Sequence, residues 1–160
     1  MPSLATQDEI QVYELHKNLL QSWNDRDAGA FADHFAHECI CVGFDGTEYT
    51  MASEIEAALS EIFRRHPVAS YVSKVRSARR VDAATVVLRA VAGMIPPGQT
   101  TLRTDRSAIQ VMVTCLIEGQ WRIVSFQNTP VRFDGRPDDL RALNHELQDL
   151  LPKPVPRRAA

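Results

Sequence analysis

Three amide side chains interrupt two apolar segments in the second half of the chain. Gln110 lies in the first segment, and Gln127 and Asn128 lie in the second. A buried amide without a partner costs roughly 1–3 kcal/mol, so each needs a protein group, a water or a ligand. Amides can hold a substrate carbonyl or hydroxyl but do not exchange protons near neutral pH. Alternatively, they pair with one another and fix the strand register or a dimer contact.

Two charged residues could complete such a site. Asp45 stands where a pocket mouth is expected, and a general base there would need burial to raise the pKa of its carboxyl group. Asp45-Gly46 is also a typical turn sequence, which explains the residue without function. Arg106 could bind an anionic ligand group, or it could pair with Asp105. In an enzyme, Asn128 and Gln110 would hold a carbonyl while Asp45 or a bound water moves a proton.

Large apolar side chains are spread over the expected helices and strands. As a set they favour binding of a small hydrophobic molecule, although each alone is typical of a core. The predicted substrate-binding residues are Trp23, Phe31, Phe35, Phe44, Met94, Arg106, Phe126 and Gln127.

The composition excludes several classes of protein. The 160 residues are 44% hydrophobic and 24% charged, which is ordinary for one soluble domain. A net charge of −2 gives no electrostatic reason to expect nucleic acid or an anionic membrane as partner. No apolar run approaches the roughly 20 residues needed to span a bilayer. The first residues lack a signal-peptide pattern and three cysteines form no disulfide framework, so we expect a cytoplasmic protein.

No metal or cofactor site is expected. His34, His37 and Glu38 do not have the His-Glu-x-x-His spacing, and Cys39 and Cys41 have no second cysteine pair. A nicotinamide or flavin fingerprint and a phosphate-binding loop are also missing from the sequence.

Residues 104–129 are expected to form a central hairpin. Two alternating segments flank Glu118-Gly119, which resembles the Asp-Gly of a type I′ turn. A two-residue turn there places Gln110 opposite Gln127 and puts Asn128 on the other face. Both faces are apolar, so we expect the hairpin to be covered on both sides.

The remaining segments read as helices followed by strands. Residues 6–23 form an amphipathic helix that begins with a Thr6–Glu9 capping box. Its apolar stripe contains Ile10, Tyr13, Leu19, Leu20 and Trp23. Asp27 caps a short helix whose inward residues are Phe31, Ala32 and Phe35. Residues 38–44 form a short strand.

A second capping box at Ser53–Glu56 opens a helix that Pro67 stops. The apolar period then changes to two over residues 68–80 and 83–95, which indicates two long strands. A loop of a few residues at 96–98 separates them from the hairpin.

This order predicts an α+β fold in which helices pack on one face of a curved antiparallel sheet. We expect a cone-shaped domain over residues 1–135. An amphipathic helix over 136–151 would pack on that domain or on a dimer partner. A disordered tail is expected over 152–160.

With these motifs in place, the chain resembles the nuclear transport factor 2-like superfamily, its SnoaL-like and ketosteroid-isomerase-like members, and most closely the SgcJ/EcaC-type subfamily. The residues that carry the resemblance cover about positions 8–130. They are Ser22-Trp23-Asn24 with Asp27, residues 42–47 (VGFDGT), Arg106 with Ile109 and Gln110, Trp121-Arg122-Ile123, and Phe126-Gln127-Asn128-Thr129.

The resemblance implies a cone of sheet with a pocket at its open end, and a homodimer through sheet surfaces. Superfamily members include isomerases, cyclases, dehydratases and non-catalytic binding proteins, and some resemble proteins of polyketide natural-product pathways. The isomerases place a carboxylate base after the first strand and a tyrosine donor in the first helix. Gly43 and Leu19 stand at those positions here, which weakens a proton-abstraction mechanism.

Two functions therefore remain open. The first is binding or cofactor-free transformation of a small hydrophobic metabolite. The second is a non-catalytic ligand-binding or dimeric adaptor protein of a biosynthetic complex. An enclosed pocket with converging polar groups would favour ligand chemistry, and a filled core with an apolar outer face would favour the adaptor.

Overall fold

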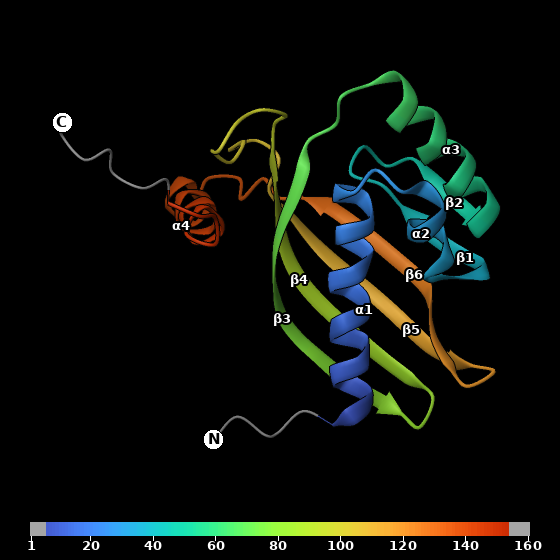
Figure 1. Cartoon of the computed structure of the whole chain (residues 1–160). Coiled ribbons are helices and arrows are strands. Elements are labelled where there is room, and N and C mark those ends of the chain that lie inside the picture. The colour runs from blue at the N-terminus through green and yellow to red at the C-terminus, as the bar shows by residue number, and fades with distance from the viewer. Residues whose placement is uncertain (1–5, 154–160) are drawn as a thin grey trace, which may run out of the picture.

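A strongly curved sheet with helices against its concave face dominates the computed structural model, which describes residues 6–153 (Figure 1). Its strands lie in the order β2-β1-β6-β5-β4-β3. They are β1 (Phe35–Val42), β2 (Glu48–Met51), β3 (Ser70–Asp82), β4 (Thr85–Ile95), β5 (Ala108–Ile117) and β6 (Gln120–Pro130). The helices are α1 (Gln7–Asn24), α2 (Ala28–Asp33), α3 (Ala52–Arg65) and α4 (Pro137–Gln148). The predicted α+β class is confirmed.

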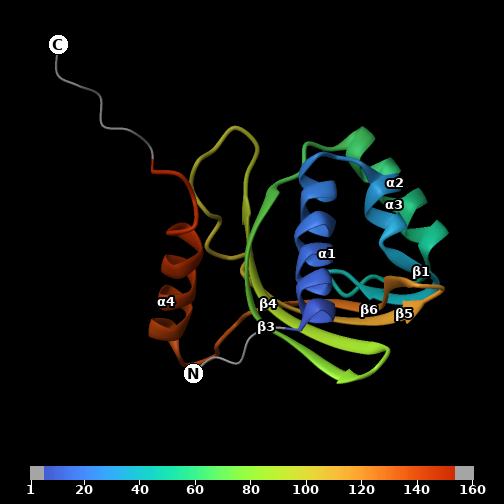
Figure 2. The same ribbon diagram turned by 60° about the horizontal axis from the view of Figure 1, so that its bottom comes forward.

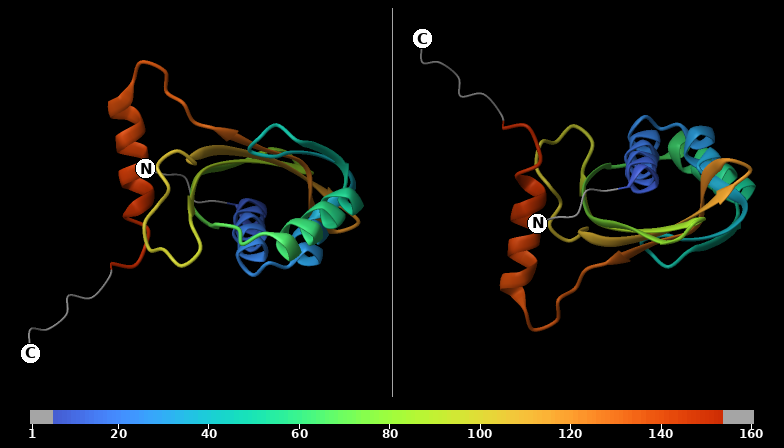
Figure 3. Two further views of the ribbon diagram at one scale, coloured as in Figure 1. Left: turned by 90° about the horizontal axis from the view of Figure 1, so that it is seen from above. Right: turned by 90° about the horizontal axis from the view of Figure 1, so that it is seen from below.

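The sheet is mixed rather than purely antiparallel. The four long strands β3 to β6 pair antiparallel as expected, but β1 runs parallel to β6. Helices α1, α2 and α3 lie inside the curve of the sheet, and α4 lies outside it (Figures 2 and 3). The helices inside the curve and the inward side chains of the strands form the main core.

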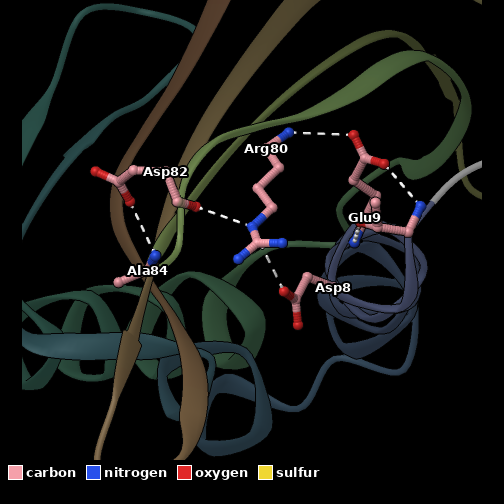
Figure 4. Close-up of polar contacts among 6 residues, drawn as sticks. Asp8, Glu9, Arg80, Asp82 and Ala84 are labelled. Carbon is pink, nitrogen blue, oxygen red and sulfur yellow. Dashed lines mark hydrogen bonds and ion pairs between the residues drawn. The ribbon is translucent and has the colours of Figure 1, made fainter.

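The start of α1 is fixed both locally and to the sheet. The capping box is confirmed, since Thr6 Oγ1 accepts from the Glu9 amide at 3.2 Å and Glu9 Oε1 accepts from the Thr6 amide at 2.8 Å. The other Glu9 oxygen accepts from the backbone amide of Arg80 at 3.1 Å (Figure 4). The Arg80 guanidinium also lies 3.8 Å from Asp8. The first turn of α1 is thereby attached to the end of β3.

The predicted apolar stripe of α1 is wrong in its first half. Ile10 and Tyr13 are 45% and 46% exposed, whereas Val12 and His16 are buried. The buried residues recur at helical spacing through Val12, Leu15, His16 and Leu19. Apolar residue type alone therefore misplaces the inward face in the first half of the helix.

Two other local expectations differ from the structure. Phe35 opens β1, which spans 35–42 rather than 38–44, instead of closing α2. The Ser53 capping box does not form, because α3 begins at Ala52 and Ser53 already lies inside the helix. The N-cap residue is Met51, which makes no side-chain cap bond. Glu54 instead accepts from the Thr50 amide at 3.1 Å. The carboxylate therefore still satisfies an amide near the start of the helix.

The central hairpin has the predicted turn but not the predicted register. Glu118 and Gly119 have φ of 50° and 79°, as a type I′ turn requires. From the turn as far as the pair Thr114–Ile123, the register is the predicted one. A β-bulge at Val124 then shifts the pairing by one residue, so Gln110 pairs with Asn128 rather than Gln127. Because one residue inverts the side-chain alternation, Asn128 moves to the concave face beside Gln110.

The convex face is only partly covered within one chain. Helix α4 packs there, with Leu143 and Leu147 against Val91 and against Leu102 of the long loop 96–107. Ile109, at 38% exposed, and other hairpin residues stay accessible, so the expected cover on both sides is incomplete. Of the predicted tail, residues 154–160 lie outside the described residues. No helix within residues 6–153 is long and apolar enough to cross a membrane.

Candidate functional site in the cone

A cavity of about 320 Å³ lies between the concave face of the sheet and the helices. Its wall is mainly apolar, and it includes five of the six apolar residues predicted to bind substrate: Trp23, Phe31, Phe44, Met94 and Phe126. The same wall contains Asn128, Asp45 and Arg106. Segments from α1 through β6 thus meet around one hollow, because the curl of the sheet brings its two ends toward each other.

Three predicted residues lie elsewhere. Phe35 is buried in the core, where its ring stands 6.4 Å from that of Phe126. Gln127 is exposed on the convex face. Gln110 is fully buried behind the cavity wall. The bulge at Val124 explains Gln127, since it turns that side chain outward and Asn128 inward.

The inner polar end of the cavity is formed by Asn128 and Tyr71. Asn128 Nδ2 donates to Tyr71 Oη at 3.1 Å, and Gln110 Nε2 donates to Asn128 Oδ1 at 3.4 Å. His16 Nε2 lies 2.8 Å from Gln110 Oε1. Tyr71 belongs to β3 and Asn128 to β6, two strands that are separated in the sheet by β4 and β5. Their contact therefore spans the concave face.

The last residues of α1 and the bend that follows hold Tyr71 in place. Asn24 Oδ1 accepts from the Tyr71 amide at 2.7 Å, and its Nδ2 donates to the Tyr71 carbonyl at 3.1 Å. Trp23 Nε1 donates to Ala69 at 2.9 Å, and Arg26 donates to Val68. Trp23, Asn24 and Arg26 thus anchor the chain at the start of β3, and with it the backbone of Tyr71.

Asp45 and Arg106 stand at the exposed rim. Asp45 Oδ1 accepts from the Thr47 amide at 2.9 Å, and this hydrogen bond holds the pKa of the Asp45 carboxyl group below its usual range. A buried base with a raised pKa is therefore not what this residue provides. The Arg106 guanidinium lies 5.1 Å from the centre of the Phe44 ring, a cation–π contact. Asp105 pairs with Arg103 instead.

Burial keeps the other titratable groups of the wall neutral. It raises the pKa of Tyr71 to about 12 and that of the Cys41 thiol to about 12. Burial also raises the pKa of Tyr49. These groups stay protonated near pH 7, so they can donate hydrogen bonds but cannot remove a proton.

The sequence interpretation missed Tyr71, Tyr49 and His16. A tyrosine near the start of a long alternating strand could have drawn attention to Tyr71. Nothing local marks His16, because its burial follows from which side of α1 faces the sheet. Within residues 6–153, no three His, Cys, Asp or Glu side chains gather as a group that could bind a metal.

Comparison with known proteins identifies the fold. No protein-family model matches the chain, and no curated protein matches it. Among solved structures, a cystatin-like domain of unknown function from Nostoc punctiforme is 24% identical, with a TM-score of 0.75 over 91% of this chain and 93% of that one. An NTF-2-like protein of unknown function from Shewanella oneidensis has 10% identity and a TM-score of 0.65, over 77% and 99% of the two chains.

A ketosteroid isomerase-like protein from Erwinia carotovora has 9% identity and a TM-score of 0.62, over 80% of this chain and 99% of that one. At these identities the similarity establishes a shared cystatin-like, NTF2-like fold.

Proposed function

We propose that the protein binds a small, largely apolar molecule in its cone cavity and holds one polar group of that molecule at the inner end. The observation that carries this proposal is the combination of a 320 Å³ apolar hollow with Tyr71 and Asn128 hydrogen-bonded at its base. Ligand sites typically combine an apolar wall with a few placed polar groups.

Binding is favoured over proton transfer. Among the described wall residues, Asp45 has a lowered pKa, and Cys41, Tyr49 and Tyr71 have raised ones. An efficient general base or acid has a pKa near the working pH. A reaction in this cavity would therefore depend on orientation and on hydrogen bonding to the ligand, without a strong base from the protein.

The test uses 2-acetylnaphthalene, an apolar bicycle with one carbonyl, as the probe. Ala108 lines the cavity and is 2% exposed, so Ala108→Leu should fill part of the space and weaken binding more than tenfold in a fluorescence titration. Ala57→Leu, on the exposed side of α3, is the matched control and should bind as the wild type does. Equal affinity of both variants would place the probe elsewhere and contradict the proposal.

We further propose that a second copy of the chain covers the convex face. Ile40, Ile109, Val111 and Ile117 are each 37–47% exposed on β1 and β5. An apolar patch of this kind is unusual on a monomer. Val111→Glu should shift the mass measured by light scattering from dimer to monomer. Val81→Glu, at a 57% exposed position near the end of β3, should not. A monomeric wild type would contradict this proposal.

A further inference from the structure

Four polar side chains, two at the base of the cavity and two buried behind it, form one continuous chain of hydrogen bonds. It starts at His16 on α1, passes through Gln110 on β5 and Asn128 on β6, and ends at Tyr71 on β3. His16 and Gln110 are 1% and 0% exposed, so water does not compete for their bonds. His16 and Gln110 are absent from the cavity wall, whereas Asn128 and Tyr71 belong to it.

The amides are oriented in the structure so that the chain runs one way. Gln110 Oε1 faces His16 Nε2 at 2.8 Å, and because this oxygen can only accept, the proton is assigned to Nε2. Gln110 then donates through Nε2 to Asn128 Oδ1, and Asn128 donates through Nδ2 to Tyr71 Oη. Tyr71 Oη is thus already an acceptor, and its own proton remains for a partner in the cavity. Each bond polarises the next, which strengthens the last donor.

We infer that His16 is a positioning residue that sets this direction, and that Tyr71 is consequently the hydrogen-bond donor at the inner end of the cavity. The site therefore selects apolar molecules that carry an acceptor oxygen, a carbonyl or an anionic oxygen, over isosteres that lack one. This inference rests on the proposed ligand-binding function and adds the chemical class of the ligand to it.

The protonation states agree with this geometry. Burial lowers the pKa of His16, so its ring is neutral near pH 7 and can exist as one tautomer. With a pKa of about 12, Tyr71 retains its proton. Reversal of both amides with the proton on His16 Nδ1 would invert the chain, and Tyr71 would then accept from a ligand. The tautomer of His16 is therefore the observable that distinguishes the two directions.

The first experiment needs neither a ligand nor a variant. The ¹⁵N chemical shifts of the His16 ring in the intact protein at pH 7 report which nitrogen carries the proton. We expect a protonated Nε2. A proton on Nδ1 would overturn the inference, whatever the protein binds.

The second experiment compares two probes of the same shape. In 2-isopropenylnaphthalene a methylene group replaces the carbonyl oxygen of 2-acetylnaphthalene. The wild type should bind the ketone about fivefold more tightly, as one net hydrogen bond allows. Tyr71→Phe should abolish the difference, and Tyr13→Phe, which changes an exposed tyrosine of α1, should preserve it.

Infrared spectra of the bound ¹³C-labelled ketone give a readout that a purely structural role would not change. The carbonyl band should lie at lower frequency in the wild type than in Tyr71→Phe. Equal affinity for the two probes in the wild type, or an unshifted band, would overturn the inference and leave the proposed function standing. Failure of both probes to bind would contradict the proposed function, and the His16 tautomer would then decide the direction of the chain alone.

Discussion

Replacement of Gln110 by leucine should destabilise the fold far more than the small change in side-chain volume suggests. Gln110 is fully buried and joins His16 to Asn128. Without it, the Nε2–H of His16 loses its partner where no water reaches, at a cost of about 1–3 kcal/mol. Asn128 Oδ1 also loses its donor, but water in the cavity can partly replace it. We therefore expect Gln110→Leu to lower the free energy of unfolding by about 2–4 kcal/mol.

The assay is urea unfolding at pH 7, followed by tryptophan fluorescence and circular dichroism. Met112→Leu is the matched control, because Met112 lies two residues further along the same face of β5 and is also fully buried. A volume-conserving exchange there should cost less than about 1.5 kcal/mol. The comparison separates the loss of hydrogen bonds from the disturbance of a close-packed core.

A double-mutant cycle tests the reasoning directly. In His16→Leu/Gln110→Leu the unpaired donor is gone, so the double variant should be more stable than the sum of the two single changes predicts. The expected coupling between His16 and Gln110 is about 1–2 kcal/mol. The account of the buried chain is refuted if Gln110→Leu costs under about 1 kcal/mol, or if the two single effects simply add.

Two further predictions concern contacts outside the buried chain. The bidentate hydrogen bonds from Arg76, at 2.6 and 2.7 Å, lower the pKa of Glu146 from 4.5 to about 2. This pair stabilises the fold above pH 4.5 and less as the pH falls toward 2. Because the pair is partly exposed, Glu146→Gln should lower the free energy of unfolding by about 1 kcal/mol at pH 7, measured by urea unfolding. The difference from the wild type should shrink as the pH falls. A difference that does not depend on pH would contradict this prediction. Asn24→Ala removes two hydrogen bonds to the Tyr71 backbone, so it should lower the melting temperature and weaken binding of 2-acetylnaphthalene. Asn18→Ala, on the exposed side of α1, is the control and should change neither quantity. A lower melting temperature with unchanged affinity would show that Asn24 does not act on the cavity.

Local sequence was sufficient where one turn or cap decides the backbone. The capping box of Thr6 and Glu9 formed because both partners lie within one helical turn. The turn at Glu118 and Gly119 formed because its two residues accept positive φ. The change of apolar period from 3.6 to 2 after Pro67 likewise located the long strands.

The tertiary structure alone decided which polar groups share the cavity. Both faces of the β5–β6 hairpin are apolar, so its period-two pattern could not reveal the bulge at Val124 that turns Asn128 inward. Tyr71 meets Asn128 only because the sheet curls across two intervening strands. His16 meets Gln110 only because α1 crosses the concave side of the sheet with its His16 face turned toward the strands. Curvature and helix rotation depend on the sum of distant contacts, and no local stretch of this sequence contains that information.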